Sequence, residues 1–460
     1  MPIYFHLRGE DRRWWILLCS YVFYGWWDSR FLLLIAFSTG IDFLIARSLY
    51  ESSCSNKRRM LLITSICTNL AILSFFKYCN FFIDSASFLM IELFGQHTNV
   101  KSLQIILPVG ISFYTFQSMS YTIDVYKKKM SPEKNWVIFA SYIAFFPQLV
   151  AGPIVRAKQL LPQFQQDREF NWQEFTLGFA QILVGYFKKI VVADSLAMVV
   201  DQIFTAPNSF NALNIFLGIF LYSFQIYCDF SGYSDIAIGL ARMLGFHFPR
   251  NFNTPYFSKN FSEFWTRWHI SLSSWLRDYL YIPLGGNRYG VVNTCKNLMI
   301  TMLLGGLWHG ANWKFVFWGL LHGIFLILQR FSSPIFNKCC EAIHLPKILR
   351  LLFAIFITYL LTCVAWVFFR SDSFSKAINV FYYMFTGNWT FANLKNKFPL
   401  VKGIFVVFLL LSCEIIHWKW NFTDIIVRRP FVRILIFAVI LWSIALLGSF
   451  NETTFIYFQF

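Results

Sequence analysis

The sequence predicts an all-α protein that crosses a membrane many times, and two observations carry this prediction. Hydrophobic residues make up 57% of the 460 residues and charged residues only 14%, whereas soluble domains usually carry about 25% charged residues. The apolar residues also gather in long runs, which are typical of membrane-spanning helices. We therefore expect one integral-membrane domain over residues 1–460, with about 10 to 12 crossings.

The apolar runs follow one another along the whole chain without a linker or a visible internal repeat. Because about 20 apolar residues span a bilayer as a helix, the longer runs are expected to cross and the shorter ones to enter it only in part. The runs lie near residues 14–27, 31–50, 60–83, 86–95, 103–123, 136–151, 175–200, 212–241, 297–308, 313–331, 349–369, 377–386, 402–418 and 431–450.

The net charge is +17, and basic residues gather at 57–59, 127–129, 156–158 and 188–189, where we expect short loops between apolar segments, the last of them within the run at 175–200. Cytoplasmic loops of membrane proteins carry such an excess of Lys and Arg, and anionic lipid headgroups attract it. The charge therefore indicates the lipid bilayer as a partner and argues against nucleic acid. The ten cysteines form neither a disulfide framework nor a zinc motif, so no metal site is predicted.

Residues 145–164 interrupt the apolar pattern with Pro147, Pro153 and Pro162. A single straight helix does not accommodate prolines in its interior. Two interpretations stay open. The broken backbone is either buried in protein at membrane depth, or it forms a loop that leaves the membrane.

Residues 250–288 contain the pattern of one amphipathic helix. Aromatic residues and leucines recur every three or four positions from Phe261 to Tyr279, which is the spacing of one helix face. Pro283 and the two glycines that follow it are expected to end the helix.

The polar face of this predicted helix carries cations. Ser262 is suited to cap its start, and Glu263 to pair with Arg267 one turn on. With Arg277 also on this face, we expect a helix that lies in the membrane interface or enters the protein from the cytoplasmic side. It serves either as a surface anchor or, through Arg267 and Arg277, as the binding surface for an anionic acyl donor.

Residues 303–323 hold two histidines, His309 and His322, within an apolar stretch. Ionisable residues are costly inside a membrane and commonly functional there. Thirteen positions separate the two, which is about 220° around a regular helix after whole turns. Either the helix breaks near 310–312, or only one of the two histidines lines a site.

The glycines of 305–310 crowd His309 rather than His322. Small residues allow close approach of neighbouring backbones, so a narrow passage is expected beside His309, where a neutral imidazole suits general-base catalysis. His322 lies in an aromatic run and is predicted to be structural and hydrogen-bonded. Asn312, one turn from His309, is a candidate group to polarise a carbonyl.

Asp229 and Asp235 lie in the apolar run at 227–241. Buried carboxylates need partners. Two roles stay open for Asp235, which either orients a catalytic histidine or pairs with Arg242 or another cation.

Five segments of the sequence together resemble the membrane-bound O-acyltransferase family, and within it most closely the bacterial branch of alginate O-acetylases, peptidoglycan O-acetyltransferases and teichoic acid D-alanyltransferases. The similarity runs over about residues 14–330. The helices at about 349–450 match only in being apolar and helical, and VAWVFFR at 364–370 is a weaker similarity to the family. The five segments are 105–126, 145–156, 227–246, 251–288 and 303–323.

The resemblance implies a ring of transmembrane helices around a central tunnel, with re-entrant and interfacial helices. The histidine of the family's WHG motif is catalytic and is here His309, and that of RWHIS, here His269, is a supporting position near the donor side. Members of that branch carry a further hydrophobic helix before the segment that here covers residues 12–27.

For function, the resemblance implies an O-acyltransferase of the bacterial cytoplasmic membrane. We expect it to pass an acetyl group from a cytoplasmic thioester, acetyl-CoA or an acyl-carrier thioester, to a hydroxyl of a cell-surface polysaccharide such as alginate or peptidoglycan, or to a periplasmic or anchored transferase of the esterase type. No bound cofactor is expected.

Two alternatives to acetyl transfer stay open. Within the family, the reaction is D-alanyl transfer to teichoic acid. Outside this class, the protein is a transporter of acyl groups or polysaccharide precursors that forms no bond itself. A scaffold for polymer export explains neither His309 nor the cationic helix face.

Overall fold

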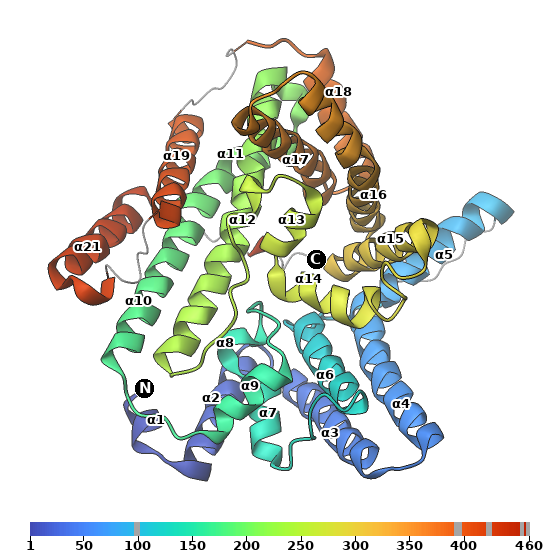
Figure 1. Cartoon of the computed structure of the whole chain (residues 1–460), viewed down its shortest axis with the longest axis vertical. Helices are drawn as coiled ribbons and strands as arrows, with labels where there is room; N and C mark the ends of the chain where they lie inside the picture. The colour runs from blue at the N-terminus through green and yellow to red at the C-terminus, as the bar shows by residue number, and fades with distance from the viewer. Residues whose placement is uncertain (96–101, 391–397, 420–425, 451–454, 457–460) are drawn as a thin grey trace. The chain divides into compact units, whose positions relative to one another are not determined.

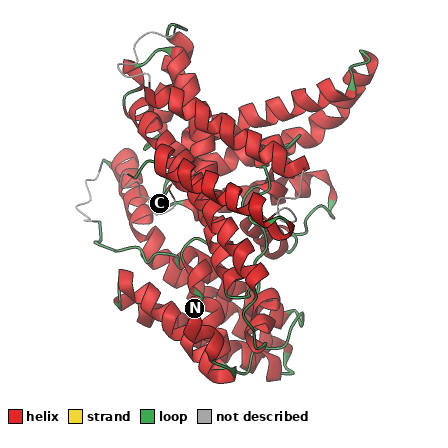
Figure 2. Ribbon diagram, turned by 90° about the vertical axis from the view of Figure 1, so that its left-hand side faces the viewer, coloured by secondary structure: helices red, strands yellow, loops and turns green. Residues whose placement is uncertain are grey.

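The computed structural model of the chain describes residues 1–95, 102–390, 398–419, 426–450 and 455–456. These residues form helices joined by loops and contain no strand (Figure 2). Seven of the helices are long and apolar enough to cross a membrane. The prediction of an all-α multi-pass membrane protein is confirmed. The number of crossings stays a prediction, because the seven are defined by length and composition alone.

The chain forms two compact units. Unit 1 comprises residues 1–175 and 240–249, and unit 2 comprises residues 176–239 and 250–460. The single domain expected from the sequence thus contains two compact units, which are described in turn.

Unit 1 contains the helices before residue 166 and the beginning of α10. Their bounds are α1 Pro2–His6, α2 Gly9–Trp27, α3 Arg30–Glu51, α4 Ser55–Leu73, η1 Ser74–Tyr78, α5 Cys79–Phe94, α6 Ile111–Tyr126, α7 Trp136–Ala144, α8 Phe146–Leu149 and α9 Ala157–Gln165.

A buried carboxylate joins three helices of unit 1. Asp42 on α3 accepts hydrogen bonds from Ser65 (2.5 Å) and Asn69 (2.7 Å) on α4, and from Ser118 on α6. The Asp42 side chain is fully buried, and a buried carboxylate is stable only with such donors. These hydrogen bonds therefore tie α3, α4 and α6 together.

The proline-rich segment after α7 is broken backbone buried in protein. Phe145 and Val155, on either side of α8, are fully buried. The side chain of Gln148 donates to the carbonyl of Tyr142 at 2.8 Å, so a polar group within the break is paired. The part of the first interpretation that buries this backbone in protein is confirmed, whereas its depth in the membrane stays a prediction.

Unit 2 contains most of α10 and α12 and all later helices. Their bounds are α10 Trp172–Tyr186, η2 Phe187–Ala193, α11 Asp194–Thr205, η3 Pro207–Ser209, α12 Ala212–Met243, η4 Pro255–Phe257, α13 Phe261–Arg267, α14 Ile270–Leu276, η5 Arg277–Tyr281, α15 Gly290–His309, α16 Trp313–Ala342, α17 Lys347–Arg370, α18 Phe374–Thr386, α19 Phe398–Lys419 and α21 Pro430–Leu447.

Glycines bring α10 and α12 into close contact, and the two helices run side by side (Figure 1). A Cβ atom added at Gly185 on α10 would lie 2.6 Å from the carbonyl oxygen of Gly232 on α12. Seven residues further along α12, Gly239 approaches the backbone of Gly178 in the same way. Larger side chains would hold the two helices apart.

Glycines also pack α15 against α16. Gly306 on α15 faces the backbone of Phe315 and Gly319 on α16, where a side chain at 306 would collide with the Phe315 carbonyl oxygen. The close backbone approach predicted for the glycines of 305–310 is confirmed.

Lys188 and Lys189 lie within a helix, so the prediction of a basic loop at 188–189 is wrong. They belong to η2, which continues directly from α10 and into α11. Lys188 pairs with Asp235, and Lys189 pairs with Asp194 and Asp229, each at 2.7 Å. Because each ammonium group has a carboxylate partner, both charges are accommodated among packed helices.

The prediction of a single helix within 250–288 is wrong, because the structure has two helices there with a break between them. α13 ends at Arg267 and α14 begins at Ile270, with His269 between them in the left-handed region at φ 43°. In an unbroken helix the Ile270 N–H would bond to the carbonyl four residues earlier. Here it donates to the carbonyl of Asn251 at 2.9 Å, and this competing contact accounts for the break.

The start of α13 also differs from the prediction. Asn260, not Ser262, caps the helix, and its side-chain oxygen accepts the N–H of Glu263 at 2.8 Å. The predicted ion pair between Glu263 and Arg267 is confirmed, at 2.7 Å.

Candidate active site

The turn between α15 and α16 places His309. α15 ends at His309, Gly310 is extended, and the side chain of Asn312 caps α16 by accepting the N–H of Lys314 at 3.0 Å. The ring of Phe315 lies against Gly310 where a Cβ would be. The helix break that the sequence offered as one alternative is therefore confirmed, and His309 belongs to a different helix from His322.

Aromatic rings from three helices surround the imidazole of His309, which is 3% exposed. The ring centroids of Trp308, Trp318 and Phe369 lie 5.1, 5.0 and 5.6 Å from that of His309, each in an edge-to-face arrangement. This geometry is favourable for aromatic pairs. It fixes the plane of the imidazole from α15, α16 and α17.

Trp308 also links His309 to His269. Its ring centroid lies 6.0 Å from that of His269 and 5.1 Å from that of His309. His269 is fully buried and packs edge to face on Phe230 at 4.6 Å. The two histidines that the sequence assigned to the site are thus in contact with one indole ring.

Trp318 contacts His322 at 4.6 Å as well as His309. His322 is fully buried and packs on Trp265 at 5.1 Å. Neither of its ring nitrogens has a hydrogen-bond partner among the residues described, so aromatic packing holds it in place of the predicted hydrogen bonds. We call His269, Trp308, His309, Trp318 and His322 the histidine cluster.

Burial keeps the ring of His269 neutral, because it lowers the pKa of this histidine to about 3. A group with so low a pKa is a weak base at neutral pH. A neutral imidazole still offers one N–H and one lone pair for hydrogen bonding. The low pKa of His269 agrees with the supporting role expected for it, and the general-base role of His309 stays a prediction.

Asp235 pairs with a cation and does not orient a histidine. Its carboxylate accepts hydrogen bonds from Lys188 at 2.7 Å and from Gln181 at 3.2 Å. Arg242, the partner considered from the sequence, pairs instead with Glu174 at 2.7 Å. Of the two roles left open for Asp235, pairing with a cation is the one observed.

The ion pairs around η2 form a second polar centre of unit 2. Asp229 on α12 joins Lys189 and also accepts the backbone N–H of Ile456 at 2.8 Å. The neighbouring hydroxyl of Tyr227 donates to the carboxylate of Glu414 on α19. We call Lys188, Lys189, Asp194, Asp229 and Asp235 the lysine cluster.

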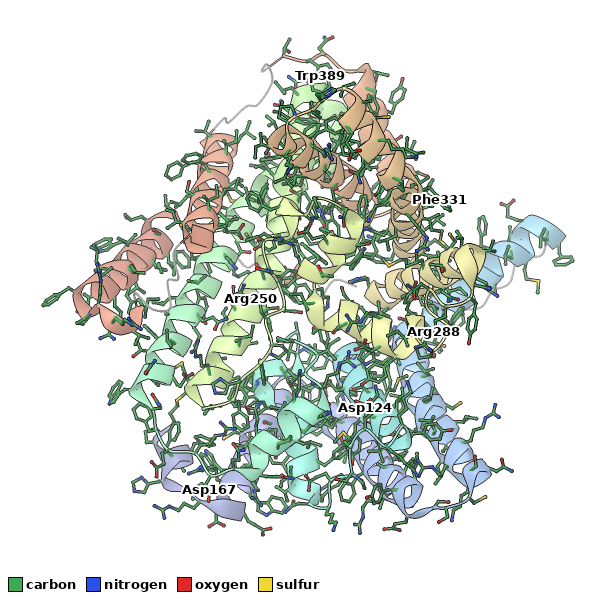
Figure 3. The ribbon with its side chains drawn as sticks, viewed as in Figure 1. Asp124, Asp167, Arg250, Arg288, Phe331 and Trp389 are labelled. Atoms are coloured by element: carbon green, nitrogen blue, oxygen red, sulfur yellow. The ribbon has the colours of Figure 1, made fainter. Side chains whose placement is uncertain are left out.

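The two arginines assigned to donor binding differ in their surroundings. The guanidinium of Arg267 binds Glu263 and lies 3.3 Å from the hydroxyl of Thr254, so it ties a loop to α13. Arg277 is 61% exposed and pairs with the adjacent Asp278, at 2.8 Å. Arg288, labelled in Figure 3, is another exposed arginine, in the loop that joins η5 to α15.

Asn312 is exposed, and its side-chain oxygen is engaged as the cap of α16. Polarisation of a substrate carbonyl would therefore fall to its amide N–H group. That role stays a prediction.

The aromatic walls and Asn251 are the parts of the site that sequence reasoning missed. Trp366, which stacks on Trp318 at 5.7 Å, and Phe369 both come from VAWVFFR at 364–370. In the sequence this segment resembles the family only weakly, and that weak resemblance is the signal that indicates a contribution of α17 to the site.

Residues 131–368 match the family model described as MBOAT, membrane-bound O-acyltransferase family. The match covers more than half of the chain and includes every member of the histidine cluster. The chain belongs to the membrane-bound O-acyltransferase family. It is an acyltransferase, as the resemblance predicted.

Among its relatives, the chain is 41% identical over 418 residues to a probable alginate O-acetylase of Azotobacter vinelandii, with 90% of this chain and 81% of that protein covered. It is 36% identical over 392 residues to the peptidoglycan O-acetyltransferase of Helicobacter pylori, covering 80% and 72%. A shorter match, 32% identical over 240 residues, is to the teichoic acid D-alanyltransferase of Streptococcus thermophilus, covering 48% and 56%.

Proposed function

We propose that the protein transfers an acetyl group from a cytoplasmic thioester to a hydroxyl of a cell-surface polysaccharide, with His309 as the general base. The observation that carries this proposal is the position of His309. It ends α15 at a break in the helix, within the stretch matched by the family, and rings from three helices hold its imidazole in a fixed plane.

The reaction follows from an imidazole held beside both substrates. His309 takes the proton of the acceptor hydroxyl as the oxygen attacks the carbonyl carbon of the thioester. The C–S bond breaks, and the thiolate leaves and receives the proton from the imidazolium. An ester and a thiol are formed, and the neutral imidazole is regenerated. General-base catalysis of this kind contributes about 10²–10⁴-fold to a rate.

The acetyl group is favoured over D-alanine by the extent of the similarities. The relatives named for O-acetylation match 80% or more of this chain, whereas the D-alanyltransferase matches 48%. The acceptor class that these relatives share is a polysaccharide outside the cytoplasmic membrane. A periplasmic or anchored transferase of the esterase type is the alternative acceptor of the acetyl group.

The donor is a thioester of coenzyme A or of an acyl carrier, presented from the cytoplasmic side of a bacterial cytoplasmic membrane. Both carry phosphate groups, which arginine binds with charge-assisted hydrogen bonds. Arg277 and Arg288 are exposed and are the candidates to bind them. Arg267 has a smaller part in donor binding, because its guanidinium is engaged with Glu263.

Acetyl transfer is tested with the full-length protein purified in detergent, where both faces are accessible. Acetyl-CoA labelled in its acetyl group is supplied with alginate, peptidoglycan fragments or a co-purified periplasmic transferase. We expect covalent label in an acceptor with the wild type, and none with His309→Ala at equal amounts of folded protein. Labelled D-alanyl carrier with teichoic acid is the matched test of the D-alanyl alternative.

A second assay separates transfer from transport. The protein is placed in sealed vesicles with the donor outside and a polysaccharide inside. Label that enters the vesicles without joining any acceptor would overturn the proposed function and favour a transporter.

A further inference from the structure

The junction between α13 and α14 holds His269 in an uncommon backbone conformation. Its φ and ψ are 43° and 55°, in the left-handed region. A residue with a Cβ is disfavoured there, and such conformations persist only where surrounding structure enforces them. A histidine of the active site is therefore held in place by something outside its own helix.

Asn251 supplies the contacts that hold this backbone conformation. It follows Arg250, which is labelled in Figure 3, and is 1% exposed. Its carbonyl accepts the N–H of Ile270 at 2.9 Å. Its side-chain oxygen accepts the N–H and the hydroxyl of Ser271, at 3.1 and 2.9 Å. The two residues directly after His269 are thus bound to a single asparagine that lies 18 positions before His269.

The orientation of the Asn251 carboxamide follows from these bonds. A backbone N–H only donates, so the atom that faces Ser271 N must be the oxygen. The amide nitrogen then points to the hydroxyl of Ser234, at 3.1 Å. Nδ1 of His269 lies 3.3 Å from the same Asn251 oxygen.

The protonation of His269 follows in turn. A carboxamide oxygen only accepts, so Nδ1 must carry the hydrogen of the neutral imidazole. The hydroxyl oxygen of Ser271, 3.5 Å from Nδ1, is also an acceptor there, because its hydrogen is engaged with Asn251. The lone pair of the ring therefore lies on Nε2.

We propose that Asn251 is a positioning residue of the active site, which holds His269 in its left-handed conformation and fixes the tautomer with hydrogen on Nδ1. Nε2 is then a hydrogen-bond acceptor for an O–H or N–H group of a substrate. The consequence for catalysis rests on the proposed acetyl transfer, whereas the tautomer does not.

The tautomer is measured directly by solid-state NMR of the full-length protein in lipid vesicles, with ¹⁵N-labelled histidine. The signal of His269 is identified by its loss in His269→Gln. We expect the Nδ1–H form in the wild type and in Asn251→Asp, whose carboxylate accepts the same hydrogen bonds. In Asn251→Ala we expect the Nε2–H form or a mixture. A wild-type Nε2–H signal, or an unchanged signal in Asn251→Ala, overturns the proposal.

Activity provides the second measurement. Asn251→Ala should lower acetyl transfer at least about tenfold, as loss of a group that orients a functional histidine commonly does. Combined with His269→Ala, it should lower the rate no further than His269→Ala alone, because residues that act through one another are not additive. Additive losses overturn the positioning role.

Asn253→Ala is the matched control. It is the same substitution in the same loop, at an exposed position whose side chain accepts from Arg250 at 3.0 Å. We expect wild-type activity and a wild-type His269 signal.

The two measurements also separate this inference from the proposed function. If the wild type transfers no acetyl group while Asn251→Ala changes the His269 signal, the proposed function fails and the role of Asn251 stands. If transfer occurs and the signal does not respond to Asn251, the role of Asn251 fails alone.

Discussion

The histidine cluster is a buried polar centre of unit 2 and the lysine cluster a partly buried one, and the two are stabilised in different ways. Aromatic rings enclose the first, with His309 in contact with Trp308, Trp318 and Phe369. Ion pairs of 2.7 Å hold the second together. Both lie among helices of which several are apolar enough to span a membrane.

The difference follows from the free energy that is needed to bury each kind of side chain. An ammonium or carboxylate group is stable in a packed interior only beside an opposite charge. An imidazole becomes neutral at the cost of one proton and then packs like an aromatic ring. Paired charges make a rigid structural centre, whereas neutral imidazoles keep a nitrogen that can take up a proton during a reaction.

The largest expected effect is the loss of catalysis in His309→Ala. Acetyl transfer should fall by about 10²–10⁴-fold, because no other side chain replaces a base at the turn between α15 and α16. The buried ring of His309 packs on three aromatic rings, so its removal should cost stability much as His322→Ala does, and activity is compared at equal amounts of folded protein. Acetyl groups on the acceptor and protein extracted in detergent are quantified together.

Full activity in His309→Ala would contradict the assignment of His309 as the general base. A loss of folded protein equal to the loss of activity would instead give His309 the structural role that we assign to the lysine cluster.

The next effect concerns the lysine cluster. Lys189→Met leaves Asp229 and Asp194 without their ammonium partner, and breaking a buried pair in this way costs about 3–5 kcal/mol. We expect a large fall in yield and in melting temperature in detergent. Lys189→Arg keeps the charge and should retain most of the stability.

Restoring neutrality sharpens this test. Lys189→Met combined with Asp229→Asn should recover part of the lost stability. If Lys189→Met is as stable as the wild type but inactive, the lysine cluster takes part in catalysis, and the contrast between the two centres fails.

The fold class and the place of His309 were predictable because each depends on local sequence. Apolar runs of about 20 residues indicate spanning helices, and the glycines of 305–310 indicated close backbones. The spacing of His309 and His322 offered a helix break near 310–312 as one of two alternatives. The resemblance then assigned chemistry to His309. The sequence did not predict whether the segment after α7 is buried, because its prolines indicate a broken helix but not whether the broken backbone lies inside the protein or outside it.

Contacts between distant residues were not predictable in the same way. The break at His269 depends on Asn251, which lies 18 positions before this histidine and binds Ile270 and Ser271. The helical placement of Lys189 depends on Asp229, 40 residues away. The local spacing of apolar residues gives no information about Asn251 or Asp229. It therefore predicted an unbroken helix at His269 and a loop at Lys189.

A smaller effect is expected at His322, which belongs to the histidine cluster but is assigned no chemistry. His322→Ala removes a ring that packs on Trp318 and Trp265, and the cavity should cost about 2–5 kcal/mol. We expect a lower melting temperature and residual activity in the folded fraction.

His322→Phe is the matched variant. It keeps a ring of similar size and removes two nitrogens that have no hydrogen-bond partner among the described residues. Its stability should lie within about 1.5 kcal/mol of the wild type. Activity in His322→Phe as low as in His309→Ala would show that both imidazoles take part in the reaction.

The smallest effect is expected at Arg277, outside both centres. Its side chain is 61% exposed, and an exposed charge contributes only about 0.2–1 kcal/mol to an ionic contact. Arg277→Ala should therefore raise the KM for the anionic donor about two- to fivefold and leave kcat nearly unchanged. The difference should shrink as salt is added, because exposed charges are screened.

Arg267→Ala is the comparison for Arg277→Ala, on the same predicted face but with a different environment. Its guanidinium binds Glu263 and the loop at Thr254, so we expect lower thermal stability with little change in donor KM. The double variant should then show the KM of Arg277→Ala and the stability of Arg267→Ala. If Arg267→Ala alone raises the KM for the donor in a salt-dependent way, its guanidinium binds the donor despite Glu263. The whole face from α13 to η5 is then the donor surface.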